Sequence, residues 1–396
     1  MKPIHYFLWV LTWVSISCQA QTQKNQVLDT TNQPATISTQ APDSTTALVQ
    51  QIIQKHAKVF LKDSITNSVS VGVLFRGQSI TGHYGELDKG KGNTPNDNTI
   101  YEIASVTKTF TGTLAAKAVL DGKFGLEDDI RLYLDGKYPN LVYQQKPILI
   151  KHLLTHTSGL PADNKGVAEV PVDLPSAERR RRVNAIEKQQ TKAKFFKYLH
   201  EIAITTVPGT HFKYSNFGTN LMAAIIEKVY KKPFQDLVKE EIIAKAQLKN
   251  TRFRLNPKEQ QRLANGYNEL GILMPHLMLE KTLWGAEGAI KSTIPDLLQY
   301  IRFQLDDRNL MAKEAHKSIR ELDTHYWIGY FWWIIGAKGK DLHFRHDGGA
   351  AGMRNVMLIY PESGIGISVM TNVIGPQIFD NLSKLGKRIY YDLKKQ

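Results

Sequence analysis

The segment Ser105-Val106-Thr107-Lys108 places a hydroxyl and an amine three residues apart. The stretch 105–121 is predicted to be helical, and on a helix residues i and i+3 share a face, so the two groups would be neighbours. A serine hydroxyl becomes a nucleophile when a base takes its proton, and a lysine can be that base if its surroundings lower its pKa. N–H groups at the helix start could also stabilise an oxyanion. So short a pattern also arises by chance, as a helix cap or a surface pair.

A second candidate is Tyr214-Ser215-Asn216, which directly precedes an apolar-periodic helix predicted over 217–230. A tyrosine near cations can shuttle protons, and an asparagine amide can hold a substrate carbonyl. Taken alone, this tripeptide is better explained as a polar turn before the helix.

The third candidate, His346-Asp347-Gly348-Gly349, follows a strand predicted over 342–346. Glycines let a substrate backbone approach closely, and the Gly349 N–H could donate to an oxyanion. The alternative is an ordinary glycine turn.

Composition sets wide limits on what the chain can do. Of its 396 residues 42% are hydrophobic and 22% charged, which is normal for a soluble globular protein. A net charge of +14 suits acidic envelope polymers as well as nucleic acid, so its sign excludes neither. Cys18 is the single cysteine. The folded domain therefore has no disulfide, no thiolate metal site and no cysteine nucleophile.

The N-terminus predicts export. An apolar run at 4–16 follows Lys2 and is too short to span a bilayer, so residues 1–20 are expected to be a signal peptide or lipoprotein signal. Ser17-Cys18 resembles the end of a lipobox, which would leave a lipidated Cys18 attached to the membrane. Cleavage after residue 20 would instead release a free protein, and both readings stay open. The expected location is the bacterial cell envelope, whether periplasmic, secreted or lipid-anchored.

Residues 21–45 are rich in Thr, Gln, Ser, Asn and Pro and are expected to form a flexible linker. Residues 46–396 then form the folded domain. Helical periodicity and β-rich runs alternate with turn signals along it. Helices are predicted at 48–60, 105–121, 151–155, 217–230 and 378–393, and strands at 69–75, 80–84, 327–335, 342–346, 353–360 and 365–371. Strands from both chain ends flanking a helical middle predict an α+β fold with an inserted all-α region.

Two further sequence features are weak candidates for functional sites. His152 and His156 are spaced i, i+4 but lack the glutamate of a metalloprotease motif, so we expect no metal site. The arginine run 179–182 lies in a charged insertion at 162–190, and a solvated face is more plausible there than a grip on nucleic acid or envelope polymer.

Together the three motifs resemble the active-site triplet of class C β-lactamases and DD-peptidases, in the serine β-lactamase and penicillin-binding-protein superfamily. That triplet is S-x-x-K, Tyr-x-Asn and Lys/His-x-Gly, in this order. The flanking segments that also match are 103–110, 153–160, 208–210 and 285–288. The resemblance covers residues 48–396 and implies a β-lactamase/transpeptidase-like fold: an antiparallel sheet flanked by helices, with an inserted all-α region.

The resemblance also implies roles in an acyl-enzyme mechanism. Ser105 attacks a carbonyl, while Lys108 and Tyr214 divide the acid/base work in a way that is open even within the family. Asn216 positions the acyl side, and His346 stands where relatives carry Lys or His and would tune Tyr214.

Backbone N–H groups of Ser105 and Gly349 would form the oxyanion hole, with Gly348 beside them. No metal or organic cofactor and no nucleic acid is implied. The expected partner is a small-molecule or peptidoglycan-like substrate, and pocket walls supplied by 162–190 and 270–290 would decide which one.

Asp347 departs from the Thr or Ser that relatives acting on β-lactams or D-Ala-D-Ala often carry. An anion there should repel a substrate carboxylate unless Arg345 or Arg354 compensates it. Esterase, D-aminopeptidase and DD-carboxypeptidase activities all stay open. The alternatives are a weak class C-like β-lactamase or a non-catalytic cell-wall peptide-binding or penicillin-binding homologue, although the intact motif residues argue against the latter.

Overall fold

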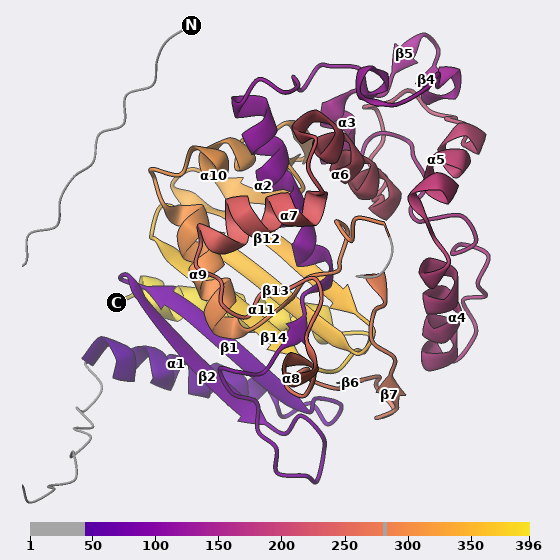
Figure 1. Cartoon of the computed structure of the whole chain (residues 1–396). Helices are drawn as coiled ribbons and strands as arrows, with labels where there is room; N and C mark the ends of the chain where they lie inside the picture. Colours follow the sequence, from indigo (N-terminus) through magenta and orange to yellow (C-terminus); the bar gives the residue numbers. More distant parts are fainter. Residues whose placement is uncertain (1–43, 280–282) are drawn as a thin grey trace, which may run out of the picture. The chain divides into compact units, whose positions relative to one another are not determined.

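In the computed structural model, which describes residues 44–279 and 283–396, an eight-stranded antiparallel sheet runs through the domain (Figure 1). Its strands follow the order β2-β1-β14-β13-β12-β11-β10-β9. They are β1 (Ser68–Phe75), β2 (Gln78–Gly85), β9 (Arg320–Asp323), β10 (Tyr326–Gly329), β11 (Trp332–Ala337), β12 (Lys340–Ala350), β13 (Met353–Tyr360) and β14 (Ile365–Thr371). The predicted α+β fold with an antiparallel sheet is confirmed.

Strands from the first and the last part of the described chain pair with each other near one edge of this sheet. Strand β1 pairs with β14 through registers such as Val71↔Val369. Every residue of β1 is buried, because helices cover both of its faces. On one side α1 (Ser44–Phe60) and α11 (Ile378–Lys394) pack on the sheet and on each other, and α9 (Ile294–Leu305) packs on the other side.

The remaining helices build the region inserted between β2 and β9. They are α2 (Thr107–Leu120), α3 (Ile150–Leu154), α4 (Ser176–Lys188), α5 (Lys192–Glu201), α6 (Asn216–Tyr230), α7 (Phe234–Val238), a π-helix (Lys239–Ala244), α8 (Pro257–Gln260) and α10 (Leu310–Ala315). The 3₁₀ turns η1 (Ala104–Val106), η2 (Ile130–Tyr133) and η3 (Pro139–Leu141) and the short strands β3 (Tyr101–Glu102), β4 (Val142–Tyr143), β5 (Lys146–Pro147), β6 (Gly266–Tyr267), β7 (Leu273–Met274) and β8 (Lys291–Ser292) link them.

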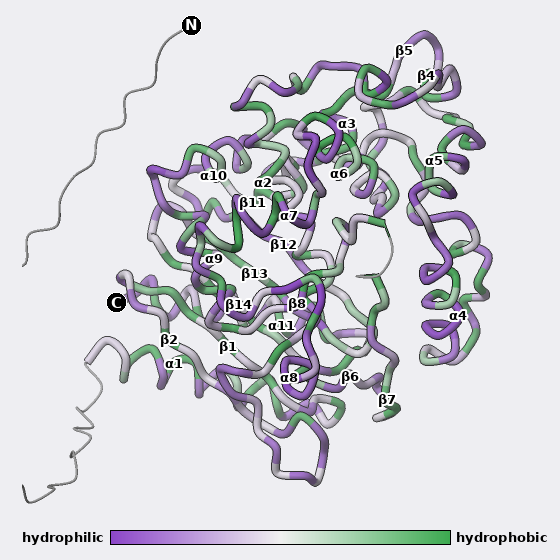
Figure 2. Tube along the Cα trace, in the orientation of Figure 1, coloured by the Kyte–Doolittle hydropathy of each residue, from purple (hydrophilic) through white to green (hydrophobic). Residues whose placement is uncertain are grey.

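Hydropathy follows these layers. In Figure 2 the central strands and α2 are mostly apolar, whereas α4 is mostly hydrophilic. Helix α2 is buried almost all round, and its Gly112 has no room for a side chain, since a Cβ there would lie 1.9 Å from the Tyr330 carbonyl oxygen. Helix α2 is therefore buried between the sheet and the other helices of the inserted region.

One strand prediction was wrong. The run 327–335 is not one strand but a hairpin, β10 and β11, that turns at Tyr330 and Phe331 with φ of +50° and +67°. Contacts with other elements hold this turn: the Phe331 N–H donates to the Leu154 carbonyl, and the Tyr330 hydroxyl donates to Glu314 at 2.7 Å. Strand β12 is also longer than predicted and contains Gly348 and Gly349, so the glycine-turn reading is wrong as well.

The predicted signal at 1–20 and nearly all of the predicted linker lie outside the described residues. Of the helices in the described part of the chain, none is long and apolar enough to cross a membrane.

Candidate active site

Ser105 lies on the 3₁₀ turn η1, immediately before α2, rather than inside a regular helix. Its neighbour Ala104 has φ of +44°, a left-handed conformation that costs a non-glycine residue about 1–2 kcal/mol. Strand β12 presses on this turn through Gly348, where a Cβ would lie 2.2 Å from the Ile103 carbonyl oxygen. Close packing of the sheet thus holds the strained turn and requires glycine at 348.

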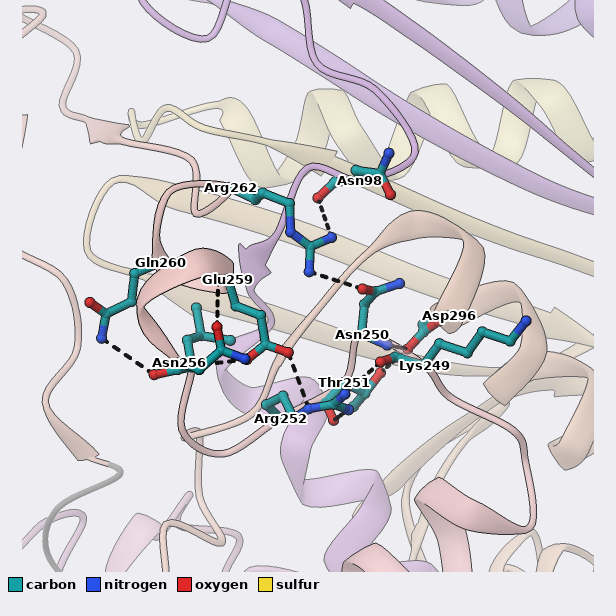
Figure 3. Close-up of polar contacts among 11 residues, drawn as sticks. Asn98, Lys249, Asn250, Thr251, Arg252, Asn256, Glu259, Gln260, Arg262 and Asp296 are labelled. Carbon is teal, nitrogen blue, oxygen red and sulfur yellow. Dashed lines mark hydrogen bonds and ion pairs between the residues drawn. The ribbon is translucent and has the colours of Figure 1, made fainter.

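A polar network fixes the backbone that leads into this turn. Strand β3, just before η1, pairs with β8, and β8 is bridged to Arg252. Figure 3 shows how the segment around Arg252 is held: Thr251 donates to Asp296 at 2.7 Å, and Arg262 donates to the Asn98 carbonyl at 3.2 Å. An Asn256–Glu259 capping box starts α8 in the same segment. These contacts hold the strand that immediately precedes the turn of Ser105.

The structure brings Ser105, Lys108 and Tyr214 together. The Tyr214 hydroxyl lies 2.9 Å from Ser105 Oγ, and Lys108 Nζ donates to the same oxygen at 3.3 Å. Lys108 is fully buried, donates to the Glu287 carbonyl at 2.6 Å and lies 4.9 Å from the centre of the Tyr214 ring. A hydroxyl with two proton-transfer partners in hydrogen-bond range is the arrangement that nucleophilic catalysis needs.

His156 positions Tyr214. The Ser215 backbone N–H donates to His156 Nδ1 at 3.2 Å, and the His156 ring packs 4.4 Å from the Tyr214 ring. Ser215 also caps α6, since its hydroxyl accepts from the Gly218 N–H at 2.8 Å. Burial, reinforced by the charge of Lys108, holds the pKa of His156 well below its usual value. This histidine is therefore a neutral side chain that packs against Tyr214, and motif reasoning gave it no role.

His346 lies near Lys108 but carries no charge at physiological pH. Its Nδ1 donates to the Asp347 carbonyl at 2.9 Å, which leaves Nε2 as a buried acceptor with no partner among the described residues. Burial first, and the charge of Lys108 second, lower its pKa to about 3. Any influence of His346 on Tyr214 must therefore come from its dipole and packing.

Of the two alternatives for Asp347, a carboxylate that repels the substrate or one compensated by a neighbouring arginine, the structure shows the second. Arg345, two residues away on the same face of β12, binds it in a bidentate way, with contacts of 2.9, 3.1 and 2.6 Å. Arg345 also donates to Ser383 of α11 at 2.9 Å. The pair thus lies on the α11 side of the sheet, and Asp347 does not line the cavity at Ser105. This removes the basis for repulsion of a substrate carboxylate by Asp347.

A cavity of about 420 Å³ opens beside Ser105, and Asn216 and Gly349 also line it. Asn216 is the first residue of α6, and its amide donates to Asp163 at 2.7 Å. Other walls come from residues between 163 and 187, within the stretch 162–190 predicted to shape the pocket. Described residues of the second predicted stretch, 270–290, also line it: Met274, Leu277, Leu279, Glu287 and Gly288.

Motif reasoning missed the acidic residues of this cavity. Asp163, Glu187 and Glu287 all line it, although they come from three separate parts of the chain. Arg179 and Arg180 line it too, so the solvated-face reading of the arginine run is wrong for these two. The other two arginines of the run, at 181 and 182, do pair with Glu178 at the surface.

No group of three or more potential metal ligands occurs within 44–279 and 283–396. His152 and His156 are separately engaged, because His152 Nδ1 accepts from the Leu149 N–H at 3.1 Å. We assign them no metal.

Comparison with known proteins places these observations in a family. The family model described as Beta-lactamase matches residues 49–383. Protein flp of Staphylococcus aureus (strain MRSA252) is 28% identical over 300 residues, which are 73% of this chain and 56% of that protein. A beta-lactamase of Providencia stuartii is 26% identical over 284 residues, 71% of this chain and 66% of its own. The chain therefore spans little more than half the length of the flp proteins.

Solved structures share the fold. A beta-lactamase/D-alanine carboxypeptidase from Yersinia pestis superposes with a TM-score of 0.74 at 24% identity, covering 89% of this chain and 100% of that one. The octameric penicillin-binding protein homologue from Pyrococcus abyssi gives a TM-score of 0.69 at 21% identity, covering 88% and 77%. At these identities the likeness concerns the fold alone.

Proposed function

Because this chain belongs to the beta-lactamase family, whose beta-lactamase and D-alanine carboxypeptidase members are serine hydrolases, we propose that it hydrolyses an ester or amide bond through an acyl-enzyme on Ser105. One observation carries the proposal: Ser105 Oγ lies 2.9 Å from the Tyr214 hydroxyl and 3.3 Å from Lys108 Nζ. Peptide-like and ester substrates both fit this chemistry, in the manner of an esterase, a D-aminopeptidase or a DD-carboxypeptidase.

The proposed reaction has two halves. In the first, Ser105 Oγ bonds to the substrate carbonyl carbon while its proton passes to the Tyr214–Lys108 pair, which then protonates the leaving alcohol or amine. In the second, water gives a proton to the same pair and adds to the acyl carbon; the bond from that carbon to Ser105 Oγ then breaks, and the pair returns the proton to Ser105 Oγ as the acid leaves. Buried Lys108 stabilises negative charge on the Tyr214 oxygen during both transfers.

The tetrahedral intermediate needs donors for its oxyanion. We assign this role to the backbone N–H groups of Ser105 and Gly349, because both residues line the same cavity. Asn216 lines it too and would hold the acyl side of the substrate through its amide.

Covalent labelling tests the proposal directly. A fluorophosphonate probe should label the wild-type protein once, and Ser105→Ala should lose both labelling and hydrolysis of a p-nitrophenyl ester while keeping its circular dichroism spectrum. Ser363→Ala, at an exposed position, is the matched control and should label normally. Equal labelling of Ser105→Ala and wild type would disprove the assignment. A wild-type protein that neither labels nor turns over any of a panel of esters, nitrocefin and D-amino-acid amides would favour a non-catalytic peptide binder.

We also propose that the protein acts in the bacterial cell envelope on a small-molecule or peptidoglycan-like substrate. The support is the short apolar run at 4–16, which follows a lysine and precedes Cys18. Intact mass of envelope-fraction protein distinguishes a lipid on Cys18 from a start at Gln21. Mature protein that retains Met1 would contradict export.

A further inference from the structure

The cavity beside Ser105 gathers three carboxylates that the proposed reaction does not use. Asp163, Glu187 and Glu287 all line it. They are close enough to interact: Glu287 and Asp163 both raise the pKa of Glu187, and Asp163 also raises that of Glu287. Three acids that line one pocket favour a positively charged occupant.

Glu287 supplies an independent sign of a missing ligand. Only 8% of it is exposed, and its Oε2 has no hydrogen-bond partner among the described residues, although the Asn220 amide is close enough to favour the charged form. A buried carboxylate oxygen without a donor is costly, and a ligand that brings a donor removes that cost. Burial keeps the pKa of Glu287 raised despite nearby Lys108.

The nearby cationic side chains of Arg180 and Lys108 do not neutralise all three carboxylates. Arg180 pairs with Glu187 and also donates to Asn184 at 2.7 Å, yet burial still raises the pKa of Glu187 to about 7. Lys108 donates to Ser105 and to the backbone carbonyl of Glu287, not to its carboxylate. Asp163 accepts a hydrogen bond from the neutral side-chain amide of Asn216. An ammonium group has three donors and no acceptor, which is the complement of these oxygens.

We propose that the acyl group of the substrate carries a protonated amine, which binds among Asp163, Glu187 and Glu287 while its carbonyl lies at Ser105. This inference rests on the proposed function, because that function places the acyl side in the cavity that Ser105 and Asn216 share. The amine is either the α-amine of an N-terminal residue or the side-chain amine of a longer acyl group, since both present the same ammonium chemistry.

Binding to a non-turning-over protein tests the inference without catalysis. The Ser105→Ala variant is titrated by calorimetry with two matched pairs of p-nitroanilides. The first pair is the p-nitroanilide of D-alanine and that of propionic acid. The second is the p-nitroanilide of Nα-acetyl-D-lysine and that of Nα-acetyl-D-norleucine. The amine of at least one pair should bind about tenfold or more tightly than its neutral match, the size expected for one charged hydrogen bond. The pair that discriminates identifies an α-amine or a side-chain amine.

Carboxylate variants in the same background locate the effect. Asp163→Asn and Glu187→Gln should each bring the amine-to-neutral affinity ratio down by about tenfold. Glu127→Gln is the matched control, a charge removed from a side chain that is 71% exposed and pairs with Lys151, and it should leave the ratio unchanged.

Equal affinities within both pairs overturn the inference, as does a ratio that neither carboxylate variant changes. Tightest binding of an acidic analogue, Nα-acetyl-D-glutamic acid p-nitroanilide, would also overturn it and point to Arg179, whose buried Nε has no partner among the described residues. Hydrolysis of a neutral p-nitrophenyl ester by the wild type tests the proposed function separately. Retained ester hydrolysis with equal affinities defeats only the inference. Amine-selective binding without hydrolysis or labelling defeats the proposed function and leaves the three carboxylates as an amine-binding site without an acyl-enzyme.

Discussion

Asp347→Asn should destabilise the protein by about 2 kcal/mol through Arg345. The side chains of the pair are only 17% and 29% exposed, and three contacts join them. Stranding one partner of a fully buried pair costs about 3–5 kcal/mol, whereas breaking an exposed pair costs about 0–1 kcal/mol. Arg345 keeps its bond to Ser383 and some access to water, so the expected value lies between these limits.

A double-mutant cycle measures this coupling. Asp347→Asn, Arg345→Gln and the double variant are unfolded in urea, and the interaction term should be about 1–2 kcal/mol. Arg308 and Asp306 provide the control, because they are also two positions apart and form a bidentate ion pair. This pair lies at the surface, where the Arg308 side chain is 90% exposed. The same cycle on that pair should show no measurable coupling.

Kinetics complete the test. Because Arg345 already neutralises Asp347, Asp347→Thr should not selectively improve kcat/KM for nitrocefin or a D-Ala-D-Ala peptide over a neutral p-nitrophenyl ester. A selective gain for the carboxylate-bearing substrates, or an interaction term near zero, would refute the reasoning. Asp347 would then act directly on the bound substrate.

Three further predictions follow from the site and its supports. Tyr214→Phe should bind substrate normally but lower kcat about 10²- to 10⁴-fold, and near wild-type kcat would remove Tyr214 from proton transfer to and from Ser105. Burial raises the pKa of Glu187 from 4.5 to about 7, so the folded state binds the extra proton; its stability should fall by up to roughly 3 kcal/mol as pH rises through that window. Urea titrations should find this slope absent in Glu187→Gln, and an equal slope in both proteins would contradict it. Gly112→Ala forces its new Cβ against the Tyr330 carbonyl and should cost about 3 kcal/mol or more, seen as a lower Tm; an unchanged Tm would mean that α2 can shift freely.

Elements with a clean hydrophobic period could be predicted closely. The predicted strands 353–360 and 365–371 have the bounds of β13 and β14. The turn between β10 and β11 could not be predicted, because Tyr330 and Phe331 are not among the residue types that usually form turns. Distant contacts with Leu154 and Glu314 hold their positive φ values, and local sequence does not reveal such contacts.

The candidate site divides in the same way. The proximity of Ser105 and Lys108 follows from their spacing, and Tyr214 could be added only through the order of the motifs. The Arg345–Asp347 pair was within reach of sequence reasoning, since residues i and i+2 share a face of a strand. The convergence of Asp163 and Glu187 was not, because helix α4 brings its acid to the cavity from a separate segment.

The pairing of β1 with β14 dictates when this protein can fold. Val71 pairs with Val369, so the hairpin β1–β2 joins the rest of the sheet only after almost the whole chain is available, and such non-local pairing is slow. Until then β1 and β2 are an isolated hairpin, which is marginally stable in water. Premature termination before β14 would therefore leave the hairpin β1–β2 separated from strands β9–β13, with apolar strand edges exposed to proteases and aggregation, and would not yield a smaller enzyme.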